Sequence, residues 1–313
     1  MSPSSTVVAT LLGALACAAC SPSGPNETVL TDGPESALHV AASDSVRPAF
    51  RGIDGDATVK APTWYVAQWG IPVDLRGGVR APKGADWRID NAHARVNWIA
   101  GARTYELAQD GSTDALPCGQ EENLFLAPTT PGDYPGHAVG LEPSLPLSML
   151  ASLPVNLGLE IVDERVEQRC AEAPNYAAYT LGLVLTTVGT PEPQALYYQV
   201  MFRDSRGLAV AHRWCPGYES ADTAVFCVDD GLEPIFDQPE PVVGGGRSAY
   251  RLELLASLRS VIASGHRKQG APRRVIDADL SHWRVTGLYY GQITMGGAVP
   301  TSRWDGFSLS QRW

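Results

Sequence analysis

Three segments of the chain alternate apolar and polar side chains, which is the pattern of a strand with one buried face. They are residues 93–99, 196–204 and 282–294. Their apolar positions predict the core-facing set, which is Ala94, Val96, Trp98, Leu196, Tyr198, Val200, Phe202, Trp283, Val285, Tyr289 and Ile293. Their opposite positions carry Arg, Asn, Gln, His, Thr and Tyr and almost no Lys or Glu, unlike an ordinary solvated sheet face.

The amide, guanidinium and phenol groups on these polar faces together indicate what kind of ligand the faces would bind. The first two hydrogen-bond in fixed geometry, and a Tyr ring adds a stacking surface. These properties suit polyhydroxylated or anionic sugars. We therefore predict a saccharide-binding groove lined by Tyr197, Gln199, Arg203, Arg284, Tyr290, Gln292, Arg95 and Asn97. The alternative is a polar face that loops cover and that binds no ligand, and a bulge in a strand would move residues to the other face.

A glycoside hydrolase needs two carboxylates about 5–10 Å apart. The most acidic strand-like segment is 159–164, where Glu160 and Glu164 share a face but lie about 13 Å apart at the rise of a strand. Glucanases with the concanavalin-like fold use an alternating Glu-x-Asp-x-Glu arrangement. Here the order is Glu-x-x-Asp-Glu, which puts Asp163 on the opposite face. The sequence therefore does not favour hydrolysis by these residues.

Residues 287–292, Gly-Leu-Tyr-Tyr-Gly-Gln, resemble the Gly-x-Tyr-x-Gln stretch of jelly-roll alginate lyases, with one extra residue before Gln292. The resemblance implies a Tyr or His that transfers a proton, beside Arg, Asn or Gln that neutralises a uronate carboxylate. The arginine-rich strand and the Gln-x-His of that family have no counterpart in this sequence. Non-catalytic carbohydrate binding is therefore the leading hypothesis. The alternatives are an enzyme on the same groove, with a lyase favoured over a hydrolase, and a protein-binding surface.

The cysteines after residue 100 indicate disulfides, because an even number in an exported chain is typical of bridged pairs. We predict the pairs Cys215–Cys227 and Cys118–Cys170, since each partner lies next to a strand-like segment.

Two of these cysteines could instead bind a metal ion together with nearby residues. A zinc site would combine His212, Cys215, Cys227 and Asp229, but their spacing fits no common zinc pattern, so no metal site is predicted. A structural calcium ion is the one cofactor for which the sequence offers ligands. These are the turn residues Asp54, Asp56, Asp277 and Asp279, which do not form a complete set.

The chain begins with an apolar run at residues 7–19 that is too short to span a bilayer as a helix. The run ends at Cys20 and is followed by Ser-Pro-Ser-Gly-Pro. This resembles the signal peptide of bacterial lipoproteins, although Cys17 stands where that family usually has Leu. The resemblance implies removal of residues 1–19, lipidation of Cys20 and a place in the bacterial cell envelope. A plain secretory signal is the alternative.

Charge and composition narrow the range of partners. The formal net charge is −10, and Lys and Arg form no basic stripe, so nucleic acid is not an expected partner. No other apolar run reaches membrane-spanning length, so membrane contact is expected through the lipid alone. Residues 20–57 are rich in Ser, Pro, Gly, Asp and Ala, which predicts a flexible tether.

Strand-like segments separated by turn residues dominate the chain from residue 58 onward. They lie at 64–69, 93–99, 104–108, 123–127, 155–164, 178–187, 196–204, 208–214, 224–228, 282–294 and 306–311. One stripe at helical period, Leu254, Leu255, Leu258, Val261 and Ile262, predicts a helix over 248–264 with Ser248 as its cap and Gly265 at its end.

These elements suit an all-β fold of two packed antiparallel sheets, and one short helix, in a single domain over residues 58–313. Such a jelly-roll sandwich is similar to the concanavalin-like carbohydrate-active proteins. The alternative is two smaller sandwiches divided near residues 131–143.

Overall fold

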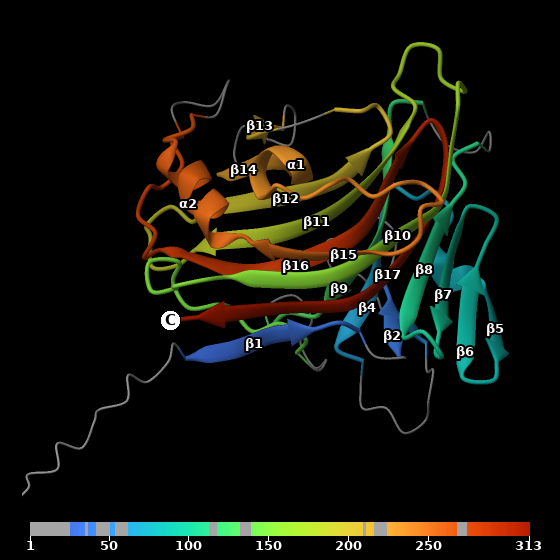
Figure 1. The fold of residues 1–313 in the computed structure, drawn as a ribbon, viewed down its shortest axis with the longest axis horizontal. Coiled ribbons are helices and arrows are strands. Elements are labelled where there is room, and N and C mark those ends of the chain that lie inside the picture. Colours follow the sequence, from blue (N-terminus) through green and yellow to red (C-terminus); the bar gives the residue numbers. More distant parts are fainter. Residues whose placement is uncertain are drawn as a thin grey trace, which may run out of the picture.

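The computed structural model describes residues 26–34, 37–41, 51–53 (backbone only), 62–112, 118–131, 139–208, 211–215, 224–267 and 274–313. Strands dominate these residues and form two sheets packed face to face (Figure 1). The prediction of an all-β, two-sheet sandwich is confirmed. Cys20, the leader before it, and Asp54 and Asp56 lie outside the described residues.

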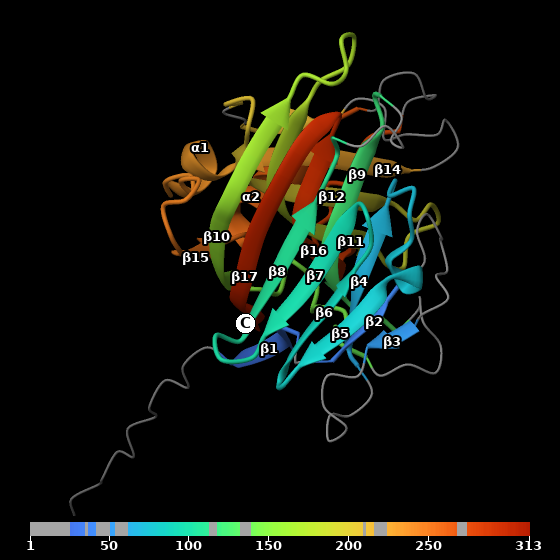
Figure 2. The same cartoon turned by 90° about the vertical axis from the view of Figure 1, so that its right-hand side faces the viewer.

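The first sheet, sheet A, is antiparallel throughout, and Figure 2 looks onto its outer face. Its order is β15 (Ser248–Glu253), β10 (Pro154–Glu167), β17 (Gly297–Arg312), β8 (Thr104–Gln109), β7 (Ala94–Ile99), β6 (Asp86–Asp90) and β5 (Val79–Lys83). β1 (Glu27–Asp32) pairs with the C-terminal part of β17. The long strands β10 and β17 pair with each other and with three of the other strands, namely β15, β8 and β1.

The second sheet, sheet B, is mixed. Its order is β13 (Arg213–Trp214), β14 (Val225–Gly231), β12 (Ala195–Asp204), β11 (Tyr176–Thr187), β16 (Trp283–Met295), β9 (Glu121–Pro128), β4 (Trp64–Trp69), β2 (Leu38–Val40) and β3 (Arg51–Ile53). The pairs β12–β14 and β2–β4 are parallel, and the other pairs are antiparallel. The expectation of purely antiparallel sheets is therefore wrong at these two pairs.

One continuous apolar core fills the space between the sheets. Its largest fully buried side chains include Trp64 from sheet B and Trp304 from sheet A, and Tyr290 contacts both of their rings. Tyr290 also stacks on Phe307 with 4.7 Å between ring centroids. The apolar surface that these aromatic side chains remove from water is a main source of the stability of the fold.

Two short α-helices lie among the described residues, α1 (Leu232–Phe236) and α2 (Leu255–Ala263), besides one 3-10 turn, η1 (Leu75–Gly77). The predicted apolar stripe of α2 is buried, and Gly265 follows its end with φ +63°. The predicted start at Ser248 is wrong, because residues 248–253 form β15. Tyr250 and Leu252 alternate there with exposed residues, and pairing with β10 satisfies the backbone.

The N-terminal part of the sheets departs from the prediction of a flexible tether over residues 20–57. β1 pairs with β17, and β2 is buried and pairs with β4. Backbone pairing and the burial of Leu38 and Val40 outweigh the turn-rich composition of this stretch. No helix in the described part of the chain is long and apolar enough to cross a membrane.

Candidate functional site

The outer face of sheet B, turned away from the core, carries a second apolar cluster. At its centre lie Trp69 on β4, Phe125 on β9 and Tyr289 on β16, which we call the aromatic cluster. Their ring centroids are 5.4 Å (Trp69–Phe125), 5.5 Å (Trp69–Tyr289) and 4.8 Å (Phe125–Tyr289) apart. Trp69 is partly exposed, whereas Phe125 and Tyr289 are buried. An outer sheet face is normally polar, so rings gathered there are a feature to explain.

Gly182 on β11 makes room for the aromatic cluster. A Cβ at this position would lie 2.1 Å from Cζ of Tyr289, far inside contact distance. The Tyr289 ring therefore lies across the neighbouring strand at the one residue type that leaves the space open. The register agrees, since Gly182 pairs directly with Tyr289.

A polar network borders the aromatic cluster at the start of β11. The Tyr176 hydroxyl donates a hydrogen bond to Glu121, and the Arg206 guanidinium lies 3.7 Å from the centroid of the Tyr176 ring. Arg206 also donates to both carboxylate oxygens of Asp204, at 2.8 and 2.5 Å. Burial, then the nearby Glu121 carboxylate, raises the pKa of Tyr176 above its usual value, so this phenol is not poised to act as a base.

The predicted residues Tyr197 and Gln199 lie on this outer face, on β12, next to Cys227 and Asp229 of β14. Arg213 donates to Asp229 at 2.7 Å. Burial raises the pKa of Asp229, and the hydrogen bond from Arg213 opposes that rise. The predicted Arg284 pairs with Thr186 at the far end of the sheet, and its guanidinium donates to the carbonyls of Ser281 and His282.

Tyr290 and Gln292 do not line this face, and the structure corrects their predicted placement. The register of β16 shifts at Thr286, because Val184 pairs with Gly287 and Leu185 with Val285. This bulge inverts every later position of the strand. Tyr290 and Gln292 therefore point into the core, and Tyr289 and Ile293, predicted as core, belong to the outer face.

Arg203 is displaced by the same kind of irregularity. β12 carries an extra residue at Phe202, since Arg203 pairs with Tyr179 and Met201 with Thr180. Arg203 therefore lies on the inner side of sheet B, where its guanidinium pairs with Glu164 of sheet A at 2.9 Å. It connects the two sheets and is not part of the outer face.

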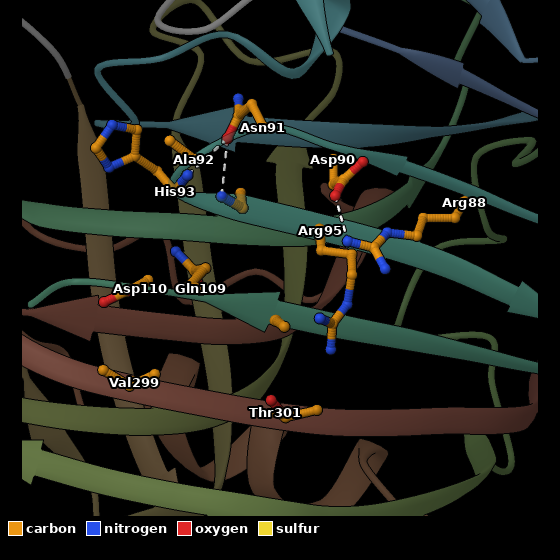
Figure 3. Close-up of a pocket in the computed structure, with 12 residues that line it drawn as sticks. Arg88, Asp90, Asn91, Ala92, His93, Arg95, Gln109, Asp110, Val299 and Thr301 are labelled. Atoms are coloured by element: carbon orange, nitrogen blue, oxygen red, sulfur yellow. Dashed lines mark hydrogen bonds and ion pairs between the residues drawn. The ribbon is translucent and has the colours of Figure 1, made fainter. Parts of the chain in front are cut away.

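Arg95 and Asn97 lie on the outer face of the other sheet, sheet A. Both donate to the Glu106 carboxylate, at 3.2 Å from Arg95 and 2.8 Å from Asn97. Arg95 borders a hollow of about 260 Å³ that Asp90 of β6 and Thr301 of β17 also line. Figure 3 shows these side chains around it. The eight predicted groove residues therefore divide among three places and do not form one groove.

The acidic strand considered for hydrolysis is also bulged. Ile161 pairs with Ser302 and Asp163 with Thr301, so Val162 is the extra residue of β10. Glu160 consequently faces outward and pairs with Arg303 at 3.3 Å, whereas Glu164 faces inward toward Arg203. The expectation that Glu160 and Glu164 share a face is wrong.

Both predicted disulfides are confirmed, with S–S distances of 2.05 Å for Cys118–Cys170 and 1.99 Å for Cys215–Cys227. Cys215, Cys227 and Asp229 lie close enough together to suggest a metal site. The two sulfur atoms are bonded to each other, so they do not offer the thiolates that zinc needs. Asp277 is engaged by the His282 ring at 2.7 Å, and a structural calcium ion stays a prediction.

Comparison with known proteins finds similar solved structures but no matching family. No protein-family model matches the sequence, and no curated protein is significantly similar to it. Among solved structures, the endoglucanase cel12A from Rhodothermus marinus has 12% identity and a TM-score of 0.41, covering 73% of this chain and 92% of that one. A family 12 xyloglucanase from Bacillus licheniformis has 9% identity and a TM-score of 0.42, covering 75% and 100%.

A family 11 xylanase from Neocallimastix patriciarum is similar at 7% identity and a TM-score of 0.31, covering 79% of this chain and 96% of that one. Scores below 0.5 at such identities carry no information about ligand or reaction.

Proposed function

We propose that this chain is a non-catalytic protein that binds polysaccharide through the outer face of sheet B. The observation that carries the proposal is the aromatic cluster, with partly exposed Trp69 at its edge and Tyr289 laid across Gly182. Flat rings bind the apolar face of a sugar, and neighbouring amides bind its hydroxyls. Gln199 on β12 and Asn123 on β9 supply such amides on the same face.

The distribution of carboxylates supports binding over catalysis. The outer positions of β11 and β16, in the middle of sheet B, carry Ala, Thr, Gly, Val, Tyr, Ile, Met and Arg side chains and no Asp or Glu. Glycoside hydrolysis needs two facing carboxylates about 5–10 Å apart. Three carboxylates stand nearer the borders of this face, and each is engaged by a neighbouring side chain: Glu121 by Tyr176, Asp204 by Arg206 and Asp229 by Arg213. A lyase base would need a phenol with a lowered pKa, and that of Tyr176 is raised.

Affinity electrophoresis and calorimetry of the full chain against a panel of neutral and anionic polysaccharides would test the proposal. We expect one of them to bind, and Trp69→Ala to weaken that binding about tenfold, the loss of one stacking contact. Trp313→Ala, which removes an exposed indole at the end of the chain, is the matched control and should bind like the wild type.

The same samples distinguish the alternatives. New reducing ends would identify a hydrolase, and unsaturated sugar products would identify a lyase. Either result contradicts the non-catalytic proposal. If no polysaccharide in the panel binds, the saccharide proposal fails and the protein-binding alternative takes its place.

We further propose that the chain is held at the bacterial cell envelope by lipidation of Cys20. The support is the apolar run at 7–19, the small residues before Cys20 and the resemblance to lipoprotein leaders. Several acyl chains on one cysteine hold a protein firmly to a membrane. Cys20→Ser should leave the precursor uncut and move the protein into the soluble fraction. If Cys17→Ser does this and Cys20→Ser does not, the wrong cysteine has been chosen.

A further inference from the structure

The outer face of sheet A carries a second hollow, of about 440 Å³, which we call the arginine hollow. It lies on the side of the sandwich opposite the aromatic cluster, because it is built on strands of sheet A. Its lining includes two arginines, two carboxylates and a small apolar wall, namely Arg247, Arg303, Asp305, Glu160, Ile99 and Ala102. No residue of the proposed polysaccharide face takes part in it.

The two arginines are held in fixed positions. Arg247 donates to both oxygens of Asp305, at 2.9 and 2.7 Å. Arg303 lies between Glu106 at 3.0 Å and Glu160 at 3.3 Å. Paired guanidinium groups of this kind present their remaining N–H donors in a fixed direction.

Gly158 on β10 allows the Arg247–Asp305 pair to lie flat on the sheet. A Cβ there would be 2.4 Å from Nη2 of Arg247 and 2.4 Å from Oδ1 of Asp305. Any other residue would lift the pair away from the floor of the hollow. The ion pair and the glycine beneath it therefore fit together as one arrangement.

The charges of the hollow select a class of ligand. Each guanidinium is already neutralised by a carboxylate, so an anion would meet as many negative groups as positive ones. What the hollow offers is a set of oriented donors and acceptors without net charge. Ile99 and Ala102 add an apolar surface beside them. A neutral sugar has hydroxyls that can bind to these donors and acceptors, and C–H groups that can pack on the apolar surface.

We propose that the arginine hollow is a second saccharide site, specific for neutral sugar residues and independent of the aromatic cluster. The paired arginines and carboxylates bind the hydroxyls, and Ile99 contacts the apolar side of the ring. The chain would then hold a polysaccharide on both outer faces of its sandwich.

Methyl NMR of isoleucine-labelled full chain tests this site separately from the proposed function. Ile99 reports on the arginine hollow and Ile293 on the outer face of sheet B. Cellohexaose should shift the Ile99 methyl in a saturable way, and hexagalacturonate should not. The Ile99 shift should persist in Trp69→Ala, because the two sites are separate. Failure of the sheet B proposal would appear at Ile293 alone.

Asp305→Asn keeps the shape of the hollow and releases Arg247, so we expect the affinity reported by Ile99 to fall about tenfold, as for one charge-assisted hydrogen bond. Gly158→Ala should have the same effect with every charge retained. Arg165→Gln, which breaks an exposed ion pair with Glu167 on the same strand, is the matched control.

The core methyl of Ile161 shows whether each variant is folded. An Ile99 methyl that does not respond to cellohexaose overturns the proposal. So does a response that folded Asp305→Asn and Gly158→Ala both retain in full, or a stronger response to hexagalacturonate.

Discussion

Gly182 is the residue on which the position of the Tyr289 ring depends. Tyr289 is buried and contacts Phe125 and Trp69, so its ring has little freedom to move aside. We expect Gly182→Ala to lower the free energy of unfolding by about 1–3 kcal/mol, as for an overpacked site, and to weaken polysaccharide binding. Denaturant titration and calorimetry measure the two effects.

A second substitution separates stability from binding at this site. Tyr289→Leu in the Gly182→Ala background shortens the side chain that the new methyl meets, so it should restore part of the stability without restoring binding. If Gly182→Ala alone is as stable as the wild type, the ring is not held against β11 as described.

Glu122 is a buried carboxyl whose titration should be visible in the pH dependence of stability. Its side chain is 4% exposed, and burial raises its pKa from 4.5 to about 7 against the opposing charge of Arg169. Between these two values the folded chain keeps a proton that the unfolded chain has lost. Stability is therefore full below about pH 4.5 and falls as the pH rises through 7, by on the order of 3 kcal/mol.

Glu122→Gln should remove this dependence. We expect the variant to match the wild type near pH 4.5 and to be more stable than it at pH 8, because the amide carries no charge at either pH. Urea denaturation of both proteins at the two pH values measures the difference. Equal stabilities at pH 8 would show that Glu122 titrates with an ordinary pKa.

At the scale of elements, the three bulged strands explain which site predictions failed. Alternation assigned the correct faces in β7 and in the first parts of β12 and β16, where Leu196, Tyr198 and Trp283 are core. After the extra residues Phe202 in β12 and Thr286 in β16, each side chain lies on the face opposite to the predicted one. Alternation cannot locate a bulge when both faces carry apolar residues, as at Tyr289 and Tyr290.

The bulge of β16 turns Tyr290 into a core residue with a measurable consequence. Its ring packs against Trp64, Trp304 and Phe307 and is 2% exposed. Tyr290→Ala should therefore lower the free energy of unfolding by about 3–5 kcal/mol, as large aromatic deletions do. Arg284→Ala, on the outer face of the same strand, should change it by less than about 0.5 kcal/mol. Thermal melts that reverse this order would contradict the observed register.

At the scale of the whole molecule, the sequence predicts the two-sheet fold but not which residues come together at the candidate site. Strand-forming patterns and turn residues identify a two-sheet sandwich, because the preference for strands is local along the chain. Trp69, Phe125 and Tyr289 come from three distant segments, and only the pairing of β4, β9 and β16 brings them together. Nothing in their local sequences distinguishes these rings from core aromatics, so the sequence alone does not predict the aromatic cluster.

The two disulfides fasten the sandwich at different scales. Cys118 lies in the connection from β8 of sheet A to β9 of sheet B, and Cys170 lies in the connection from β10 of sheet A to β11 of sheet B, so their bridge ties two crossovers between the sheets together across a sequence separation of 52. The bridge between Cys215 and Cys227 spans 12 residues and fastens the edge of sheet B. Closing the longer loop removes more entropy from the unfolded chain, about 4 kcal/mol against about 3.

Replacing both cysteines of a pair by serine should therefore destabilise the chain to a different extent for each of the two bridges. The Cys118/Cys170 variant should lose more of its free energy of unfolding than the Cys215/Cys227 variant. It should also lose protection of β9 and β10 together in hydrogen exchange, since the crossover that precedes β9 and the one that follows β10 are then no longer tied to each other. The Cys215/Cys227 variant should exchange faster only in β13 and β14. Uniformly faster exchange in both variants would show that neither bridge acts on a defined part of the sandwich.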